Sequence, residues 1–331
     1  MHKSYTACTT SSSLCSMSRP YEYLTEDCVK GRLTWNKAIV AAERALKGLA
    51  TGEARQTRRV KLQLGESPNF IFIMCGYLRD CDYGGLVSLS VTKFVGNRSL
   101  QPPLPIMHSD VALMDENTGV TKAVIPGRDL TKWVIPSVSV VATKYLHGET
   151  GGTLAIIGAG NQGRLHAIAL QGHFHFSKVR VWNRTASKAE DLVNELNREI
   201  EASPFATAAS VEECVTGADV IVTATNSSQT LVQGSWIKKG AHINAIGVSV
   251  TTTELDADTY RASKIYTDNK AEAETELNSI VQMGVKFECE VGDVIVQKVQ
   301  APKRGDTTIF QSSGTAVQYC AMARLMYNMY K

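Results

Sequence analysis

Residues 153–163, TLAIIGAGNQG, join a short apolar strand to a glycine-rich turn. A helix-forming run, RLHAIALQG, follows directly, and this context makes the Gly-x-Gly-x-x-Gly spacing informative. Gly158 permits the tight turn, Gly160 lets the backbone approach a pyrophosphate, and Gly163 lets helix and strand pack closely. Free N–H groups at the start of the helix attract phosphate. The predicted phosphate site comprises Gly158, Gly160, Asn161, Gln162 and Gly163.

The second strand of this unit ends in VRVWNRT, residues 179–185. An Asp or Glu at its tip normally accepts a hydrogen bond from the ribose 2′-hydroxyl. Here Asn183 stands at the tip, followed by Arg184 and Thr185. An arginine attracts a 2′-phosphate, and Asn183 and Thr185 can donate hydrogen bonds to it. The sequence predicts NADP(H) rather than NAD(H); in the alternative interpretation, Arg184 merely begins the next helix.

Two further loops follow apolar strands, and loops at the carboxyl ends of parallel strands face the ligand. Residues 223–226, TATN, follow the strand DVIV, and residues 247–249, GVS, follow HINAI. We therefore expect Thr223, Thr225 and Val248 to contact the cofactor.

The wider pattern changes near residue 150. Before it, a helix over 34–50 precedes strand-like runs at 60–64, 69–77, 86–95 and 110–119, which predicts a largely antiparallel sheet. Pro136 is predicted to open a helix ending near residue 146. Beyond residue 152, short apolar strands alternate with helical stretches, which predicts a parallel, doubly wound sheet. The amphipathic helix over 315–331 is expected to return to the first domain or to meet a partner subunit.

Length and composition exclude several classes of protein. The 331 residues suffice for two domains, and a net charge of +3 without a basic cluster argues against a nucleic-acid partner. No long charge-free apolar run predicts a membrane span. The eight cysteines form no CxxC pair, so we expect no metal site and a cytoplasmic location. Residues 1–20 are expected to form a disordered tail, with an organelle-targeting peptide as the alternative.

From about residue 34 onward, the chain resembles the ornithine cyclodeaminase/mu-crystallin family. The resemblance rests on seven segments: ATKYL (142–146), IIGAGNQG, VRVWNRT, GADVIVTAT, GSWIKKGAHINAIG, TELD (253–256) and TTIFQSSGTAV (307–317). It implies a Rossmann domain over 134–305 and a discontinuous α+β substrate and dimerisation domain over 21–133 and 306–331. It also implies a homodimer that transfers hydride between NADP(H) and a C=N carbon, as in ketimine reduction.

The chain departs from the family where a substrate would bind. A family lysine is replaced within Val87–Ser90, and a family Arg-Thr pair is replaced by Val134 and Ile135. Val134 would make that wall of the pocket apolar. Ser249 stands at the catalytic aspartate position of the cyclodeaminases, which argues against ornithine cyclodeamination.

The resemblance also implies roles for the remaining polar residues. Arg59 matches a substrate-binding arginine, although Arg58 would replace it if the strand register slipped by one, and both could simply be solvated. His108 matches a histidine able to donate a proton, with a structural role as the alternative. Asp293 is expected to face the pocket, and Ser312 to lie near the nicotinamide.

Two functions follow from this pattern. One is an NADPH-dependent imine reductase whose substrate, a neutral cyclic imine or a carbonyl compound, lacks the usual carboxylate; in the alternative, Arg59 alone holds a substrate carboxylate. The other is an NADPH-dependent small-ligand-binding protein with little or no catalysis.

Overall fold

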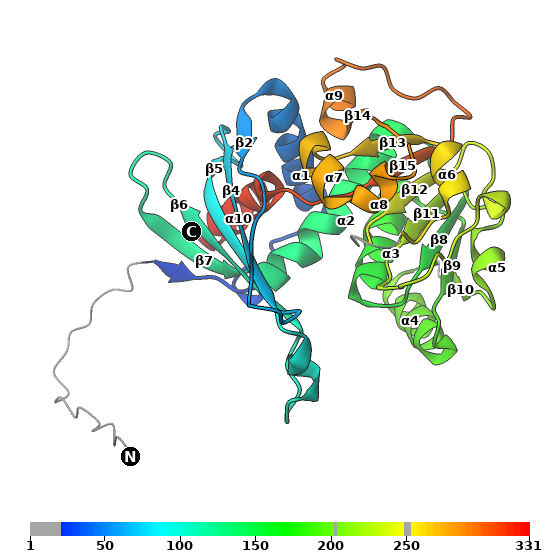
Figure 1. The fold of residues 1–331 in the computed structure, drawn as a ribbon, viewed down its shortest axis with the longest axis horizontal. Coiled ribbons are helices and arrows are strands. Elements are labelled where there is room, and N and C mark those ends of the chain that lie inside the picture. Colours follow the sequence, from blue (N-terminus) through cyan, green and yellow to red (C-terminus); the bar gives the residue numbers. More distant parts are fainter. Residues whose placement is uncertain (1–20, 202–203, 248–252) are drawn as a thin grey trace.

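The computed structural model describes residues 21–201, 204–247 and 253–331. Two sheets lie side by side, one built from the blue to blue-green part of the chain and one from the green to orange-red part (Figure 1). The expectations for residues 1–20, Val248 and Ser249 fall outside the described residues.

The first sheet is antiparallel except where β1 pairs with β7. Its order is β1-β7-β6-β5-β4-β2, with β3 pairing with β4. The predicted antiparallel sheet is therefore confirmed. Its strands are β1 (Glu22–Tyr23), β2 (Ala54–Gln56), β3 (Val60–Gln63), β4 (Phe70–Leu78), β5 (Gly85–Lys93), β6 (Met107–Met114) and β7 (Thr121–Pro126). The short helices η1 (Glu26–Val29) and η2 (Val95–Ser99) flank them.

Alternation along the strands separates two faces of this sheet. In β5, Val87, Leu89 and Val91 are buried, whereas the residues between them are only half-buried. The buried face packs against α1 (Trp35–Thr51) and α10 (Ala316–Tyr330), as expected for the last helix. The other face carries no helix among the described residues (Figure 1).

Helix α2 (Gly127–Leu146) connects the two halves, because it packs against α1 and α10 on one side and α3 and β12 on the other. The prediction that Pro136 opens this helix was wrong. Pro136 lies inside it, nine residues after its start. A proline is costly there because it donates no hydrogen bond to the carbonyl four residues before it. The dense packing of α2 overrides this local preference, since Pro136 and every residue over 137–143 are buried.

The second sheet is parallel throughout, in the order β10-β9-β8-β11-β12-β15-β13-β14. Its strands are β8 (Thr153–Ile157), β9 (Lys178–Trp182), β10 (Phe205–Thr207), β11 (Val220–Thr223), β12 (His242–Ala245), β13 (Lys264–Thr267), β14 (Phe287–Glu290) and β15 (Thr308–Gln311). The associated helices are α3 (Asn161–Phe174), α4 (Ala186–Glu199), α5 (Val211–Val215), η3 (Gly234–Trp236), α6 (Ala257–Arg261), α7 (Lys270–Glu276), α8 (Asn278–Val281) and α9 (Val291–Ile295).

Both faces of the parallel sheet are covered, as a doubly wound fold requires. Leu154 and Ile156 of β8 belong to a core shared with α2, α3 and the first sheet. Ala155 and Ile157 of the same strand belong to a second core with α5 and α6. The predicted Rossmann sheet beside an α+β region is thereby confirmed.

The expected domain boundaries at 133/134 and 305/306 do not coincide with the points where the chain passes from one sheet to the other. β15 pairs with β12 and β13, so residues 308–311 belong to the parallel sheet and not with α10. The chain returns to the first sheet only after Gln311. A boundary at 133/134 would also divide α2, a continuous helix that contacts both halves.

None of the helices in the described part of the chain is both long and apolar enough to cross a bilayer.

Candidate active site

The glycine turn between β8 and α3 has the geometry that its sequence predicts. Gly158 has a φ of 114°, a region that L side chains rarely adopt. A Cβ on Gly163 would lie 1.8 Å from the Gly158 carbonyl oxygen, so only glycine permits this approach of helix to strand. A Cβ on Gly160 would meet no atom within 4 Å. Gly160 therefore faces open space.

That open space belongs to a cavity of about 320 Å³ at the carboxyl ends of β8, β9 and β11. Ligands of doubly wound folds bind at this edge of the sheet. The cavity contains six of the residues predicted to bind the cofactor: Gly158, Gly160, Asn183, Arg184, Thr185 and Thr225. Its other lining residues are Ala159, Trp182, Lys188, Ala224, Asn226, Ser227 and Leu231.

Four predicted cofactor residues do not line this cavity. Asn161, Gln162 and Gly163 form the first turn of α3, where Gly163 packs against the glycine turn. Thr223 is fully buried as the last residue of β11, and the chain reaches the cavity only at the next residue, Ala224. The prediction for Thr223 placed the end of the strand one residue too early.

Two positively charged side chains line the end of the cavity beside β9. Arg184 and Lys188 are both exposed, and among the described residues neither side chain makes a hydrogen bond or an ion pair. Thr185 between them is the N-cap of α4, with no hydrogen bond from its side chain to the helix. Two cations at the positive end of a helix dipole favour a bound anion. Lys188 was not predicted, although its position four residues after Arg184 was a usable signal.

Asn183 lines the cavity and also has a structural role. Its Oδ1 accepts a hydrogen bond from the Ala159 N–H at 3.1 Å, and its Nδ2 donates to the Thr185 carbonyl at 3.0 Å. The side chain thus ties the tip of β9 to the glycine turn and presents Arg184 and Thr185 beside it.

Glu254 supports the opposite wall of the cavity. Its buried Oε1 accepts from the backbone N–H of Thr225 at 2.7 Å and also from the Thr225 hydroxyl. Burial raises the pKa of Glu254. Its Oε2 lies where a Cβ on Gly247 would be 2.2 Å away. Glu254 therefore joins the loops after β11 and β12, and sequence reasoning assigned no role to this residue of the TELD segment.

Arg59 lies where the two sheets meet. Its Nη1 donates to Glu276 Oε2 at 2.9 Å, and its Nη2 donates to the Ser313 carbonyl at 3.1 Å. Its Nε lies 3.7 Å from Glu272 Oε1, and the guanidinium lies 4.8 Å from the centre of the Phe72 ring. The Arg59 side chain is only 14% exposed, so the alternative of a solvated arginine was wrong.

Asp268 holds the loop that carries Ser312. This carboxylate is 1% exposed and directly follows β13. It accepts from Ser312 Oγ at 3.1 Å, Ser313 N at 2.9 Å, Gly314 N at 2.9 Å and Gln318 Nε2 at 3.2 Å. The buried Ser312 is therefore used within the loop, and the network aims the Ser313 carbonyl at Arg59. Sequence reasoning missed Asp268.

His108 does not join this site within one protomer. The strand register pairs His108 with Thr92 and Thr92 with Ile71, which is paired with Leu62. Directly paired residues share a face, so His108 lies on the face without helices, opposite to Phe72 and Arg59. Its ring Nε2 lies 3.5 Å from Asn97 Nδ2, and the side chain is exposed.

The last two predicted substrate residues also lie elsewhere. Val134 is 1% exposed and belongs to the main hydrophobic core, so it does not line an open pocket. Asp293 is half-buried on α9. Burial raises the pKa of Cys289 and that of Glu290, and the charge of Asp293 raises both further. α9 packs against α1, since a Cβ on Gly292 would lie 2.3 Å from the Leu46 carbonyl.

The glycine turn and Arg59 lie along one edge of the parallel sheet. The turn follows β8, and Ser313 follows β15, three strand positions away through β11 and β12. With a spacing of about 4.8 Å per strand, the two lie roughly 14 Å apart. A dinucleotide whose phosphates meet the glycine turn can therefore point its reactive end toward Arg59.

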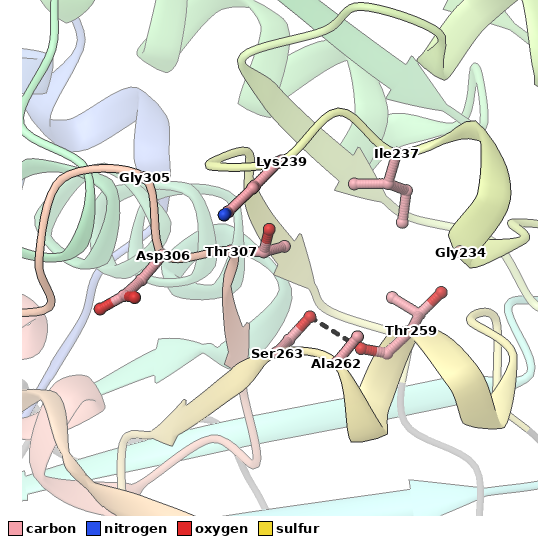
Figure 2. A pocket seen from close by; sticks show the side chains of 9 residues that line it. All are labelled: Gly234, Ile237, Lys239, Thr259, Ala262, Ser263, Gly305, Asp306 and Thr307. Atoms are coloured by element: carbon pink, nitrogen blue, oxygen red, sulfur yellow. Dashed lines mark hydrogen bonds between the residues drawn. The ribbon is translucent and has the colours of Figure 1, made fainter.

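A second cavity, of about 380 Å³, lies at the opposite edge of the sheet (Figure 2). It is lined from the segments that precede β12, β13 and β15, including Lys239, Ser263 and Thr307. Its carboxylate, Asp306, already pairs with Lys264 at 2.8 Å. Parallel strands present their ligand-binding loops at the carboxyl ends, so this cavity is not the candidate active site.

Comparison with known proteins agrees with this geometry. Residues 22–331 match the ornithine cyclodeaminase/mu-crystallin family. The chain belongs to this family. The ketimine reductase mu-crystallin of Macropus fuliginosus is 32% identical over 294 residues, which cover 88% of this chain and 91% of that protein.

Solved structures share the whole architecture. The Δ1-pyrroline-2-carboxylate reductase of Thermococcus litoralis, in complex with NADH and L-proline, is 25% identical with a TM-score of 0.83; the match covers 93% of this chain and 97% of that one. An archaeal alanine dehydrogenase dimer with bound NAD is 26% identical with a TM-score of 0.84, covering 93% and 95% of the two chains. Relatives of this chain are thus oxidoreductases that act on imines with nicotinamide cofactors.

Gly160 faces open space whereas Gly163 is tightly packed, so substitution by alanine should have different effects at the two positions. Gly160→Ala places a methyl group in the open cavity, where a pyrophosphate would approach. We expect the free energy of unfolding, measured with urea, to change by no more than about 0.5 kcal/mol. The dissociation constant of NADPH should rise at least about tenfold.

Gly163→Ala is the matched comparison, because its methyl group would meet the Gly158 carbonyl. It should lower the free energy of unfolding by about 1–3 kcal/mol. Unchanged NADPH affinity in a stable Gly160→Ala protein would contradict a pyrophosphate at this turn.

Proposed function

We propose that this protein is an NADPH-dependent imine reductase whose substrate lacks a carboxylate beside the C=N carbon. The proposal rests above all on the cavity at the glycine turn, where Arg184 and Lys188 pair with no other described residue and lie at the end that would receive a 2′-phosphate. The described residues that line this cavity include no carboxylate. Similarity to ketimine and pyrroline-2-carboxylate reductases supports the reaction type.

The residues present fit a nicotinamide dinucleotide. Gly158 and Gly160 would hold the pyrophosphate, Arg184 and Lys188 the 2′-phosphate, and Thr225 a ribose or phosphate oxygen. When bound, the reduced nicotinamide supplies the hydride. Reduction adds that hydride to the C=N carbon and moves the π electron pair onto nitrogen, so a protonated imine becomes an amine. The chain's own contribution is to orient the imine and to exclude water.

The substrate proposal rests on the charges around Arg59. Arg59 would be the guanidinium for a substrate carboxylate, but it is already bound to Glu276 and the Ser313 carbonyl. Leu89 and Val134, in the regions where the family carries a lysine and an arginine, are buried in the core. A charged hydrogen-bonded contact contributes about 1.5–3 kcal/mol, and neither Leu89 nor Val134 can make one with a carboxylate.

A second candidate is an NADPH-dependent small-ligand-binding protein with little or no catalysis. The observation that favours it is the position of His108, which the sheet separates from Arg59 and so from the role of proton donor in the same protomer. Saturable ligand binding without turnover would support this candidate.

We also propose a homodimer in the cytoplasm. The face of the first sheet without helices exposes Val60, Leu62 and Ile73, which are 68%, 62% and 43% exposed. Val60 pairs directly with Ile73, so these side chains form one apolar strip. An archaeal relative forms a dimer, which agrees with a second copy as the partner of this face.

The strip gives a test of assembly. Leu62→Glu should leave the protomer folded, because Leu62 has few contacts to lose, and should halve the mass measured by sedimentation. Val120→Glu, an equally exposed apolar residue in the turn between β6 and β7, is the control and should keep the dimer mass. A wild-type monomer would contradict the proposed dimer.

The cofactor assignment predicts a selective loss. Arg184→Ala removes one charged contact to the 2′-phosphate, so NADPH should bind about 10–100-fold more weakly and NADH less than about threefold. Arg198→Ala, at the other end of α4, should change neither affinity. Equal weakening of both cofactors by Arg184→Ala would exclude the 2′-phosphate site.

Turnover distinguishes the two proposed functions. NADPH oxidation should be followed by absorbance with pairs of five- and six-membered cyclic imines that differ only in a carboxylate on the C=N carbon. We expect the carboxylate-free member of each pair to be reduced with the higher kcat/KM, by at least about tenfold. Tight NADPH binding without oxidation in the presence of any imine would favour the binding protein.

A further inference from the structure

Glu254 holds one wall of the cavity at the glycine turn through both its side chain and its backbone. Its Oε1 accepts hydrogen bonds from the backbone N–H of Thr225 at 2.7 Å and from the Thr225 hydroxyl. Its carbonyl oxygen accepts from the N–H groups of Leu231 at 2.9 Å and Val232 at 3.0 Å. Thr225 and Leu231 line the cavity, so this one buried residue fixes two points of the same wall.

The contact with Glu254 determines the direction of the Thr225 hydroxyl. A hydroxyl has one proton and two lone pairs, and an ionised carboxylate can only accept. Two donors on one oxygen favour the ionised form of Glu254. The Thr225 proton is therefore directed at Glu254, and one lone pair accepts from the Ser227 N–H at 3.2 Å. Among the described residues no third partner bonds to this oxygen, so Thr225 can offer a ligand one lone pair and no proton.

The cavity thus has a donor side and an acceptor side. Ser227, the other hydroxyl residue on the wall with Thr225, also uses its proton inside the loop, because its Oγ donates to the Gln229 carbonyl at 2.8 Å. On the side of β9, Arg184 and Lys188 offer only donors, and the first N–H groups of α3 have no partner within the helix. Phosphate oxygens need donors and are served there, whereas a ligand group that donates is served at Thr225.

A phosphate at Thr225 would be unfavourable. Its oxygens only accept at neutral pH, so they would face a lone pair of Thr225 with the carboxylate of Glu254 directly behind it. Like charges repel strongly where water is scarce. A ribose hydroxyl would instead donate to Thr225 and extend the chain of hydrogen bonds that ends at Glu254, and such chains strengthen each member.

The position of Thr225 selects a ribose among the donors of a dinucleotide. A Cβ on Gly158 would lie 3.0 Å from Thr225 Cγ2, so this side chain lies directly beside the glycine turn. The pyrophosphate binds at such a turn, and the two riboses are the groups attached to it. The adenine amino group and the nicotinamide carboxamide also donate hydrogen bonds, but each lies one ring further away.

We propose that Glu254 is a positioning residue for the cofactor, which keeps Thr225 as an acceptor and thereby selects a ribose hydroxyl at this wall. The inference rests on the proposed function, since it takes NADPH as the ligand, but it concerns binding and not hydride transfer. It narrows the partner of Thr225 to a hydroxyl. In NADPH the adenosine ribose keeps its 3′-hydroxyl and the nicotinamide ribose keeps its 2′- and 3′-hydroxyls, and analogues of the cofactor distinguish these sources.

The test removes hydroxyls from the ligand and from the protein in combination. Calorimetry gives the dissociation constants of NADPH and of analogues in which each free ribose hydroxyl in turn is replaced by hydrogen or by fluorine. The variants are Thr225→Val, which keeps the shape, Thr225→Ser, which keeps the hydroxyl, and Glu254→Met, which removes the carboxylate at similar length. Glu212→Gln, an exposed residue of α5, is the matched control.

One of the deoxy analogues should bind to the wild type, Thr225→Ser and Glu212→Gln at least about fivefold more weakly than NADPH, and it identifies the contacting hydroxyl. In Thr225→Val this ratio should be less than about twofold, because the acceptor is already absent. In Glu254→Met the ratio should fall at least about twofold, since the Thr225 proton loses its partner and can turn toward the ligand. A Glu254 that only supported the fold would weaken both ligands equally and leave the ratio unchanged, which would overturn the inference.

The fluorinated analogues test the direction of the hydrogen bond in the wild type, so they decide the inference even if Glu254→Met does not fold. Fluorine accepts but cannot donate. The fluorinated ligand should therefore bind at least about fivefold more weakly than NADPH, as the deoxy ligand does. Binding as tight as that of NADPH would show that Thr225 donates, and an equal effect of every deoxy analogue on the wild type and Thr225→Val would show that it meets no hydroxyl. Either result overturns the inference.

Binding and turnover separate this inference from the proposed function. If NADPH binds with the expected ratios but no imine is reduced, the role of Glu254 stands and the reductase does not. If NADPH is oxidised in the presence of an imine while the wild type binds NADPH and all deoxy analogues equally well, the reductase stands and the role of Glu254 is overturned.

Discussion

The contact between Gly163 and the Gly158 carbonyl fixes the site, because it sets how closely α3 approaches β8. A methyl group at Gly163 would push the helix away from the strand, and with it the N–H groups that α3 directs toward the turn. Asn183 then ties the tip of β9 to Ala159 in the same turn, which carries Arg184 to the cavity. The position of Arg184 in the cavity thus depends on contacts between uncharged groups of the glycine turn, α3 and Asn183.

The parallel sheet and much of its cavity could be predicted from short stretches of sequence. The glycine spacing, the apolar strands and the polar tip of β9 predicted the parallel sheet and much of its cavity, since each lies within about thirty residues of chain. Pro136 shows the limit of this reasoning, because its local preference to begin a helix yields to the burial of α2 on both sides. β15 shows another, since nothing local tells a strand which of two sheets it will enter.

The polar residues around Arg59 could not be predicted from spacing. Glu272 and Glu276 lie more than two hundred positions from Arg59, and Asp268 lies more than forty from the Ser312–Gly314 loop that it holds. These residues meet because β13 and β15 are neighbours and because Arg59, which lies between β2 and β3, reaches the Ser313 carbonyl beyond β15. The face of the sheet on which His108 lies could not be predicted without the strand register, because successive side chains along a strand alternate between the two faces.

The two ends of the ligand edge differ in charge, and this difference bears on catalysis. Arg184 and Lys188 at the glycine-turn end suit a phosphate, whereas Arg59 at the other end is paired with Glu272 and Glu276. Protonation of an imine nitrogen makes the neighbouring carbon a better hydride acceptor, and the positive charge falls as the hydride arrives. Nearby carboxylates therefore stabilise a bound, protonated imine more than the transition state. The hydride step itself must be accelerated by orientation at the mouth of the glycine-turn cavity.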